Sequence, residues 1–509
     1  MHNIVNIINF VRGFDPNGKD YEMINTVNRE LELCQKYEFP CTFLLQYDAL
    51  IRQDYQEIFR NTDCDLELGI WIEIVKPLTE ACGIPWRGRP GMDWDWHVNP
   101  GFLMAYTQAQ REQLCDEIME KFREIYGHYP KLVGSWLLDS YSMDYMSRKY
   151  ELTAFVVCRE QWGVDAYTLW GGYYNQGYYA SKKNMLSPAQ SSDCQIPVPV
   201  FRMLGIDPVY EYDNRRYATI GETFTIPYPI YTLEPSLKMG KSEHCVNWFM
   251  DTYFQDKTIH FAYAQMGQEN SFHWSGIQDG WHVQMKVLKE QRDSGRVQVE
   301  KLSQTGEWFS GRFKSTPPTS IVAETDWSDN GLKSVWYDCK RYRTNLFLDK
   351  DTFLIRDIYL FDENYKERYY EEPCTEWSAI YDNLPVIDGV QWSNQEIRCG
   401  LYPEGKVVGM TVEKSGESHV VRLKLEQGEE TVICSEDGIR IEGAGRWFFQ
   451  RKPDAETSMD VRRDRIAFEH RGFSYAVKIN GNIEKTEQGY LLTPAENVIC
   501  LNMNSEGRE

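Results

Sequence analysis

Residues 132–139 read LVGSWLLD, an apolar run that ends on an acidic residue. Runs of the same kind recur along the first 300 residues, and we identify seven of them: 5–11, 41–47, 66–75, 132–139, 153–160, 198–204 and 259–265. Nearly every residue in these runs is apolar. Such runs are typical of strands buried on both faces, as in a parallel sheet.

Helical patterns lie between several of these runs. Residues 22–37 and 108–126 place apolar side chains three and four positions apart, and Gly127 follows the second pattern as a helix stop. Strands that alternate with helices indicate βα units. The sequence therefore predicts a seven-stranded (β/α) barrel over residues 1–296, the expected catalytic domain.

The chain changes character near residue 297. From there, short segments of alternating apolar and polar residues are separated by turn signals such as Asp388-Gly389, Asp437-Gly438 and Asn480-Gly481. This pattern is typical of an all-β region. We predict a second domain, residues 297–509, and favour a β-sandwich for it.

Composition narrows the possible partners. The net charge of −21 argues against a nucleic-acid partner or an anionic membrane surface. No run of eighteen apolar residues occurs, and the first thirteen residues lack the charged leader and cleavage site of a signal peptide. Thirteen cysteines without a CxxC pair indicate reduced thiols. We expect a cytoplasmic protein and leave open whether it forms a homo-oligomer.

Charged and aromatic residues gather where the apolar runs end. In a barrel of parallel strands the loops after the carboxyl ends converge, and active sites form there. The residues expected there to bind substrate are Arg12, Asp15, Asp48, Trp71, Glu73, Trp136, Arg159, Glu160 and Asp165. A solvated rim also collects acids, so the set argues for a site more strongly than any one position does.

Asp139 and Glu269 are the candidate catalytic pair. A pair of carboxyl groups can cleave a glycosidic bond when one donates a proton and the other attacks or activates water. Asp139 ends an apolar run, and Glu269 follows another within the polar and aromatic stretch QENSFHW. Asp139 could instead cap the next helix, and Glu269 could be a loop carboxylate bonded to backbone amides.

Two segments are rich in aromatic residues and glycine. Residues 91–102 read GMDWDWHVNPGF, and residues 162–179 read WGVDAYTLWGGYYNQGYY. Flat amphipathic rings suit stacking on sugars, so we expect Trp71, Trp94, Trp96, Trp136 and Trp170 to contact a carbohydrate, with His97 on the same wall of the cleft. The second segment could equally be an oligomer interface or a buried aromatic cluster.

A metal site is an alternative interpretation of the first segment. Asp93, Asp95 and His97 alternate, so an extended chain could present all three to an ion. The same alternation describes a strand-like loop with buried Trp94 and Trp96. The sequence contains no GxSxG, no GxGxxG before a helix and no Walker loop, and we predict no cofactor.

The order of elements resembles the glycoside hydrolase/deacetylase superfamily, whose catalytic domain is a seven-stranded (β/α) barrel. The runs NFVRGFDP, WRGRPGMDWDWHVNPGF, GSWLLDSYS, DAYTLWGGYYNQGYY and FAYAQMGQENSF are similar to an uncharacterised bacterial family near that superfamily. This closer resemblance covers most of residues 1–300 and part of the C-terminal region.

The resemblance has different implications for the two branches of the superfamily. Its deacetylases hold a metal with an aspartate pair after strand one and an HxxxH pair after strand three, whereas this chain has Asp15 alone and GIWIEIV with Glu73. Its family-57-type glycosidases, the nearest in layout, place a nucleophile after strand four and an acid/base after strand seven. Those positions correspond to Asp139 and Glu269, with Glu and Asp exchanged.

Three functional hypotheses follow. The first is a glycoside hydrolase that cleaves a small oligosaccharide or glycoside, with Asp139 as nucleophile or base and Glu269 as general acid. The second is a metal-dependent carbohydrate deacetylase that uses Asp93, Asp95 and His97. The third is a non-catalytic sugar-binding protein on a degenerate barrel.

Overall fold

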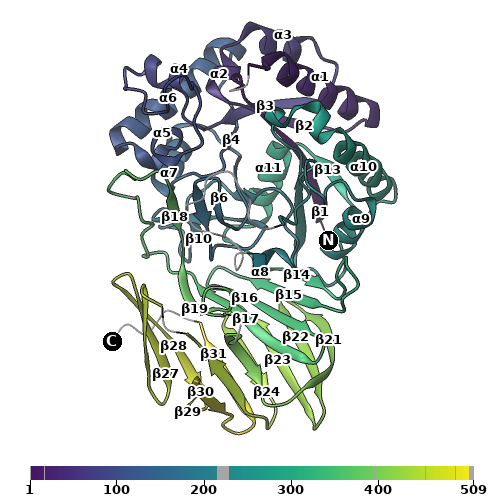
Figure 1. The fold of residues 1–509 in the computed structure, drawn as a ribbon, viewed down its shortest axis with the longest axis vertical. Helices are drawn as coiled ribbons and strands as arrows, with labels where there is room; N and C mark the ends of the chain where they lie inside the picture. Colours follow the sequence, from purple (N-terminus) through teal and green to yellow (C-terminus); the bar gives the residue numbers. More distant parts are fainter. Residues whose placement is uncertain are drawn as a thin grey trace.

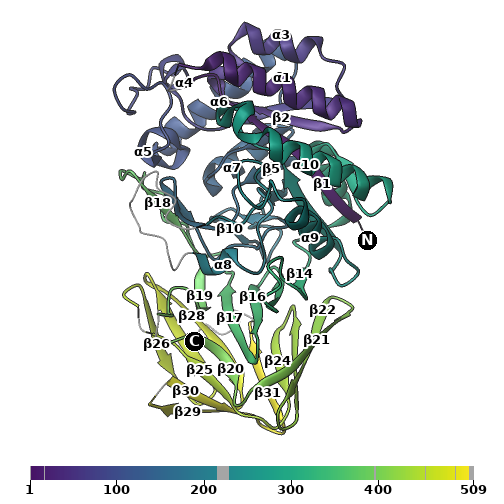
Figure 2. The same cartoon turned by 45° about the vertical axis from the view of Figure 1, so that its right-hand side comes forward.

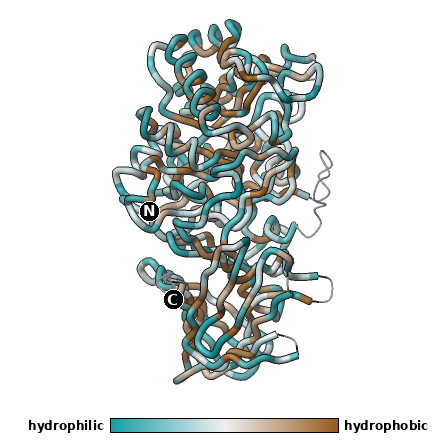
Figure 3. Tube along the Cα trace, turned by 90° about the vertical axis from the view of Figure 1, so that its left-hand side faces the viewer, coloured by the Kyte–Doolittle hydropathy of each residue, from teal (hydrophilic) through white to brown (hydrophobic). Residues whose placement is uncertain are grey.

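The computed structural model describes residues 2–15, 18–214, 229–394, 397–452, 454–487 and 489–503. Within these residues an α/β half carries the N-terminal part of the chain and an all-β half carries the C-terminal part (Figure 1). Hydrophobic segments run through the interior of both halves (Figure 3). None of the described helices combines the length and apolar character that a membrane crossing requires.

A parallel sheet of seven strands forms the core of the α/β half. The strands follow the order β12-β1-β2-β3-β4-β5-β11, and every neighbouring pair is parallel. Their bounds are β1 (His2–Val11), β2 (Cys41–Leu45), β3 (Leu66–Trp71), β4 (Leu132–Gly134), β5 (Ala154–Val157), β11 (Val200–Arg202) and β12 (Phe261–Met266). The predicted seven parallel strands are confirmed, and several are shorter than the apolar runs that indicated them.

The sheet is curled but does not close into the predicted barrel. Among the described residues, β11 and β12 share no ladder, and the outer edge of β11 pairs instead with antiparallel β8 (Gly177–Tyr178). Side-chain amides span this joint: Gln265 Oε1 accepts from the Leu204 amide at 2.7 Å, and Gln176 Oε1 accepts from the Tyr263 amide at 2.9 Å. Closure by backbone pairing fails because the segment between β5 and β11 occupies that edge.

Helices cover the outer face of the sheet (Figures 1 and 2). The helices of this half, including short ones in the connecting segments, are α1 (Asp20–Tyr37), α2 (Tyr47–Leu50), α3 (Gln53–Asn61), α4 (Lys76–Ala81), α5 (Val98–Gly101), η1 (Leu103–Ala105), α6 (Gln108–Tyr126), α7 (Ser140–Lys149), α8 (Glu211–Asn214), α9 (Glu243–Tyr253), η3 (Asn270–Phe272) and α10 (His273–Asp293). Helix α6 has the predicted bounds because Thr107 and Gln110 form a capping box at its start and Gly127, at φ 82°, ends it.

The segment between β5 and β11 adds short strands that reach the C-terminal half. These are β6 (Gln161–Val164), β7 (Tyr167–Leu169), β9 (Ala180–Ser181) and β10 (Asn184–Pro188). Strand β18 (Ala379–Tyr381) comes from the C-terminal half and pairs in parallel with β7. Figure 1 shows β18 rising from the all-β half toward α7. The two halves therefore share a small sheet.

The α/β half extends beyond residue 296, where the sequence placed the end of the first domain. Strand β13 (Gln298–Glu300) pairs with β1 in parallel, and helix α11 (Leu302–Arg312) packs against β5 and β1. The antiparallel strands of the C-terminal half begin only at Thr319. The division of the chain at 296/297 stays a prediction.

The C-terminal half contains two antiparallel sheets that face each other. The first has β14 (Thr319–Ala323), β15 (Lys333–Asp338), β16 (Tyr342–Asp349), β17 (Thr352–Leu360), β19 (Leu384–Asp388), β20 (Gly400–Pro403), β25 (Trp447–Gln450), β30 (Gly489–Thr493) and β29 (Asn482–Thr486). The second has β21 (Val407–Ser415), β22 (Ser418–Leu425), β23 (Glu429–Ser435), β24 (Gly438–Glu442), β31 (Val498–Asn502), β28 (Phe473–Asn480), β27 (Arg465–His470) and β26 (Thr457–Val461). Buried side chains of both sheets, such as Val335 and Val421, belong to one core, which is the arrangement of a β-sandwich.

Gly267 allows β12 to lead into the loop that carries Glu269. Its φ is +132°, and a Cβ placed there would lie 1.9 Å from the carbonyl oxygen of Ile8. We expect Gly267→Ala to lower the free energy of unfolding by about 3 kcal/mol or more, because both the backbone angle and the close approach to β1 are lost. Urea unfolding of purified protein measures this effect.

Gly276→Ala is the matched control. Gly276 lies in α10, and no heavy atom comes within 4 Å of a Cβ built there. We expect that substitution to raise stability by up to about 1 kcal/mol, since alanine is the better helix former. Equal effects of the two substitutions would contradict the role given to Gly267.

Candidate active site

Arg12 joins two buried carboxylates at the carboxyl ends of the sheet. Its guanidinium donates to Glu73 from Nε and Nη2, each at 3.1 Å, and to Glu269 Oε1 from Nη1 at 3.0 Å. Arg12 follows β1, Glu73 follows β3 and Glu269 follows β12, and the three residues are 5 %, 2 % and 8 % exposed. The predicted convergence of strand ends is therefore present for these three positions.

Several neighbouring groups fix this arrangement. The backbone amide of Arg12 donates to Asn270 Oδ1 at 2.9 Å, and Asn270 Nδ2 donates back to the Arg12 carbonyl at 3.0 Å. The indole of Trp71 donates to Glu73 Oε2 at 2.9 Å, and the ring of Trp94 lies 4.1 Å from the Arg12 guanidinium carbon. Burial raises the pKa of Glu73, although the charge of Arg12 opposes that rise.

A pocket of about 330 Å³ lies against this ion-pair network. Its lining includes eight residues that the sequence singled out: Arg12, Glu73, Trp94, Trp96, Trp136, Arg159, Asp165 and Glu269. Tryptophan rings and carboxyl groups together give it the mixed lining of a small-molecule site. We call this cavity the central pocket.

Asp165 also lines the central pocket, and the surroundings of its carboxyl group differ from those of Glu73 and Glu269. It lies in the turn between β6 and β7 with φ at 57°, and no hydrogen bond or ion pair to its carboxyl group occurs among the described residues. Desolvation by the pocket walls, together with the charge of Glu269, raises its pKa to about 7. The side chain remains accessible through the pocket, so a bound ligand would remove water and desolvate it further.

Glu234 also lines the central pocket, and sequence reasoning missed it. Its carboxylate accepts from Thr232 Oγ1 at 3.0 Å and from Gln268 Nε2 at 2.9 Å. Burial raises its pKa, and the charge of Arg159 opposes that rise. Glu234 follows no apolar run, so no pattern in the sequence marked it.

Asp139 is not in the central pocket. Its Oδ1 accepts from the Ser142 amide and from Arg111 Nη1, both at 2.9 Å, and its Oδ2 accepts from Ser142 Oγ at 2.8 Å. The side chain is fully buried at the start of α7. The structure does not bring Asp139 to Glu269, because β4 ends at Gly134 and the chain then turns into a capped helix. This matches the alternative interpretation of Asp139 as a helix cap.

Four further predicted positions contact protein groups instead of lining the pocket. Trp71 lies beneath it, fully buried. Asp15 accepts from His273 Nε2 at 2.9 Å, and the buried Asp48 accepts from the Ala49 amide at 2.8 Å. His97 contacts Asp95, with Nδ1 2.6 Å from Oδ1.

Apart from the turn at residues 163–165, which lines the pocket, the segment 162–179 is buried, which corrects the expectation that its tryptophan rings stack on a carbohydrate. The Trp170 indole donates to Asp388 of the sandwich at 2.9 Å, and its ring stacks on Tyr212. Glu160, just before it, pairs with Arg343 at 2.9 Å and with Arg202 at 3.3 Å. Trp170 and Glu160 therefore stabilise the contact between the halves, as the buried-cluster alternative implied, and do not line the pocket.

The proposed metal ligands in residues 91–102 do not converge. Asp95 is occupied by Arg89 at 2.9 Å and by His97, whereas Asp93 lies 3.3 Å from Lys76 Nζ. To bind one ion, the ligand atoms of three residues must lie within a few ångströms of one another. Asp93, Asp95 and His97 form no such group in the described part of the chain.

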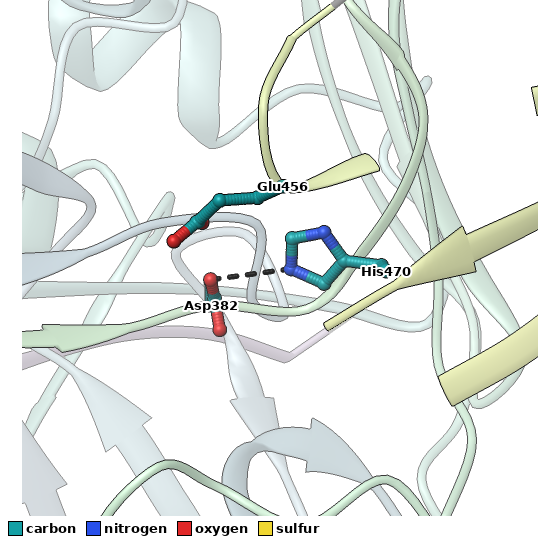
Figure 4. A group of neighbouring side chains, drawn as sticks. All are labelled: Asp382, Glu456 and His470. Carbon is teal, nitrogen blue, oxygen red and sulfur yellow. Dashed lines mark hydrogen bonds and ion pairs between the residues drawn. The ribbon is translucent and has the colours of Figure 1, made fainter. Parts of the chain in front are cut away.

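One other group of possible ligands lies at the edge of the sandwich. Asp382, Glu456 and His470 point toward one another, with His470 Nε2 3.3 Å from Asp382 (Figure 4). The Arg368 guanidinium binds both Asp382 and Glu456. Because this side chain already supplies the positive charge, the group is an ion-pair cluster and no candidate metal centre.

Comparisons with known proteins concern the fold. No family model and no curated protein matches the sequence. A structure from Parabacteroides distasonis, provisionally named a glycoside hydrolase/deacetylase, has a TM-score of 0.53 at 14 % identity over 78 % of this chain and 95 % of that chain. At this level of identity the likeness is one of fold.

Two other solved structures have weaker likenesses to this chain. A Mycobacterium smegmatis protein, provisionally named a polysaccharide deacetylase, has a TM-score of 0.38 at 11 % identity and covers 61 % of this chain and 91 % of its own. A 4-alpha-glucanotransferase of Thermococcus litoralis has a TM-score of 0.31 at 9 % identity and covers 99 % and 97 %.

We expect Arg12→Met to lower the free energy of unfolding at pH 7 by about 3–5 kcal/mol, since Glu73 and Glu269 would be left buried without a cation. The loss should shrink as the pH falls toward 5. The pKa of Glu73 is already raised by burial, so without Arg12 the folded state takes up a proton there more readily than the unfolded chain. Urea unfolding at both pH values measures this.

Arg446→Met is the control for that substitution. Arg446 pairs with Glu404 at the surface, where the side chains are 50 % and 44 % exposed. We expect a change of at most about 1 kcal/mol, with little dependence on pH. A comparable loss in both variants would mean that the Arg12 pairs are worth no more than surface pairs.

Proposed function

We propose that the protein is a glycoside hydrolase whose reaction takes place in the central pocket. Asp165 is the general acid, and Glu269 is the nucleophile or the base. The observation that carries the proposal is the contrast between these two carboxyl groups within one pocket. Asp165 has no cationic partner among the described residues, whereas Glu269 binds the Arg12 guanidinium. Paired acids in opposed environments are the equipment of glycosidic cleavage.

The two environments assign the roles. With its pKa raised to about 7, Asp165 keeps a proton near neutral pH and can donate it to the oxygen of the leaving group. Glu269 is oriented by two contacts with Arg12 and is available to attack the anomeric carbon or to activate water. Asp165 thus takes the role of general acid that the sequence analysis gave to Glu269, and Glu269 takes the role of nucleophile or base given there to Asp139.

The pocket walls suit a sugar ring. Trp94, Trp96 and Trp136 line one part of the cavity, and flat amphipathic rings favour contact with pyranose faces. A volume of about 330 Å³ lies at the small end of ligand pockets. A short glycoside, or the end of an oligosaccharide, therefore fits better than an internal stretch of polymer. The fold likeness to a provisionally named glycoside hydrolase/deacetylase is consistent with this class.

The other two hypotheses have less support. A metal-dependent deacetylase needs converging ligands, and Asp93, Asp95 and His97 are engaged with other side chains instead. A sugar-binding protein without catalysis gives no reason for an acid with a raised pKa beside an Arg12-bound carboxylate. Turnover distinguishes it from the hydrolase.

We expect Asp165→Asn and Glu269→Gln each to lower kcat/KM for glycoside hydrolysis at least about a hundredfold, because each removes one of the two carboxyl groups. A panel of aryl glycosides and short oligosaccharides identifies the substrate. Asp165→Asn should affect dinitrophenyl glycosides much less than oligosaccharides, because that leaving group departs without a proton. Glu269→Gln should affect both substrate types.

Asp207→Asn is the matched control. The pKa of Asp207 is raised to about 7, as is the pKa of Asp165. Asp207 is buried outside the pocket, where its carboxylate accepts from the Val209 amide and the Trp327 indole. This variant should keep wild-type turnover. Wild-type turnover in Asp165→Asn would overturn the assignment of the acid. Sugar binding without hydrolysis of any glycoside would favour the non-catalytic alternative.

The acid role of Asp165 also predicts a pH dependence. Catalysis needs its protonated form, so kcat/KM should fall as the pH rises through about 7. A profile from pH 5 to 9 on the wild-type enzyme measures this limb. The residual activity of Asp165→Asn toward dinitrophenyl glycosides should lack it. An unchanged limb in that variant would assign the titration to another group.

A further inference from the structure

The charges around the central pocket do not balance. Among the described residues of its lining, the acids are Glu73, Asp165, Glu234 and Glu269, and the cations are Arg12 and Arg159. Arg12 is shared by two of these acids, and Arg159 pairs at 2.8 Å with Glu211, which lies outside the lining. Both guanidinium groups are therefore already matched with carboxylates. Even with Asp165 protonated, the carboxylates of Glu73, Glu234 and Glu269 outnumber the guanidinium groups, so the described lining presents an excess of negative charge to the ligand.

Among the acids of the described lining, Glu234 is the one that has no role in the proposed catalysis and forms no ion pair. No described cation lies within ion-pair distance of it, although the charge of Arg159 acts on it from farther away, and its two hydrogen bonds come from the neutral donors Thr232 and Gln268. One bond reaches each carboxylate oxygen, so the group is oriented while each oxygen keeps a free lone pair. An oriented carboxylate of this kind is suited to receive a ligand cation.

The chemistry of the ligand follows from these charges. A uronate or a phosphorylated sugar would bring a negative charge beside four acids, which costs binding energy. A neutral sugar leaves the excess charge uncompensated. A sugar with an ammonium group would pair with Glu234 and reduce the repulsion among the acids.

We propose that the central pocket selects an amino sugar with a free ammonium group, which binds to the carboxylate of Glu234. This inference rests on the proposed glycosidase function for the site, because the sugar is the one whose bond Asp165 and Glu269 would cleave. Glu234 is then a specificity residue that contacts the substrate and takes no part in proton transfer.

The test is direct binding to wild-type protein near pH 6.5, measured by calorimetry. The probes are glucosamine and galactosamine, their N-acetylated and neutral counterparts, and the matching uronates. We expect each amine to bind at least tenfold more tightly than its N-acetylated form, and the uronates to bind most weakly. In Glu234→Gln the Kd for the amines should rise at least tenfold, while the Kd for neutral sugars changes less than twofold.

Glu243→Gln is the control, since it removes the same charge from an exposed position at the start of α9. It should leave the amine preference intact. Amines that bind no better than neutral sugars, or that fail to bind, would overturn the proposal, as would a preference that survives in Glu234→Gln.

The two proposals fail separately. Amine binding without hydrolysis of any glycoside would remove the glycosidase function and keep the charge selection. Hydrolysis of neutral glycosides without a preference for amines would remove the charge selection and keep the glycosidase function.

Discussion

The pairing of Arg12 with Glu73 and Glu269 is the interaction on which the site depends. It joins the ends of β1, β3 and β12, and β2 separates the first two in the sheet. A flat sheet would hold these ends apart, so the ion pairs require the curl that the strands adopt. Burying three charges is unfavourable unless all are matched, and here the bidentate contact, the Trp71 indole and the Trp94 ring provide the compensation.

The sandwich half holds the hairpin that carries Asp165 in place, although none of its residues is among the described lining of the pocket. Asp165 lies in the turn between β6 and β7, and β7 pairs with β18 of the C-terminal half. The residues beside this hairpin are bound to the sandwich as well: Glu160 pairs with Arg343, which also pairs with Asp357, and Trp170 binds Asp388. These contacts explain why the aromatic segment is buried. They also give the all-β region a structural role in holding the acid.

Much of the fold could be predicted from the sequence because buried parallel strands are apolar at nearly every position. The same runs pointed to Arg12, Glu73 and Glu269, since the residue after a strand end is placed by the strand itself. Asp139 ends such a run too, but an N-cap and a catalytic acid leave the same local pattern. Only the position of Arg111 and Ser142 distinguishes them. Glu234 follows no strand, so tertiary structure alone brings it to the pocket.

The sequence also did not predict that the sheet stays open between β11 and β12. Closure depends on what occupies the edge of β11, and the two-residue strand β8 has no pattern that a sequence reveals. The aromatic content of residues 162–179 was clear, but its burial was not. An exposed stacking loop and an aromatic cluster between two halves have the same composition, and partners more than 200 residues away, such as Asp388, determine which one forms.

Access to ligand, more than a raised pKa, distinguishes Asp165 from the buried acids. Glu30 in α1 is fully buried and its pKa is raised well above the usual value, yet no route leads a ligand to it. Asp139 and Glu160 are buried too, and each binds an arginine. Asp165 lacks such a cation among the described residues and opens into a cavity lined by tryptophan. An unpaired acid lowers stability above its pKa, so a site that keeps one within reach of ligand points to chemistry that needs the proton.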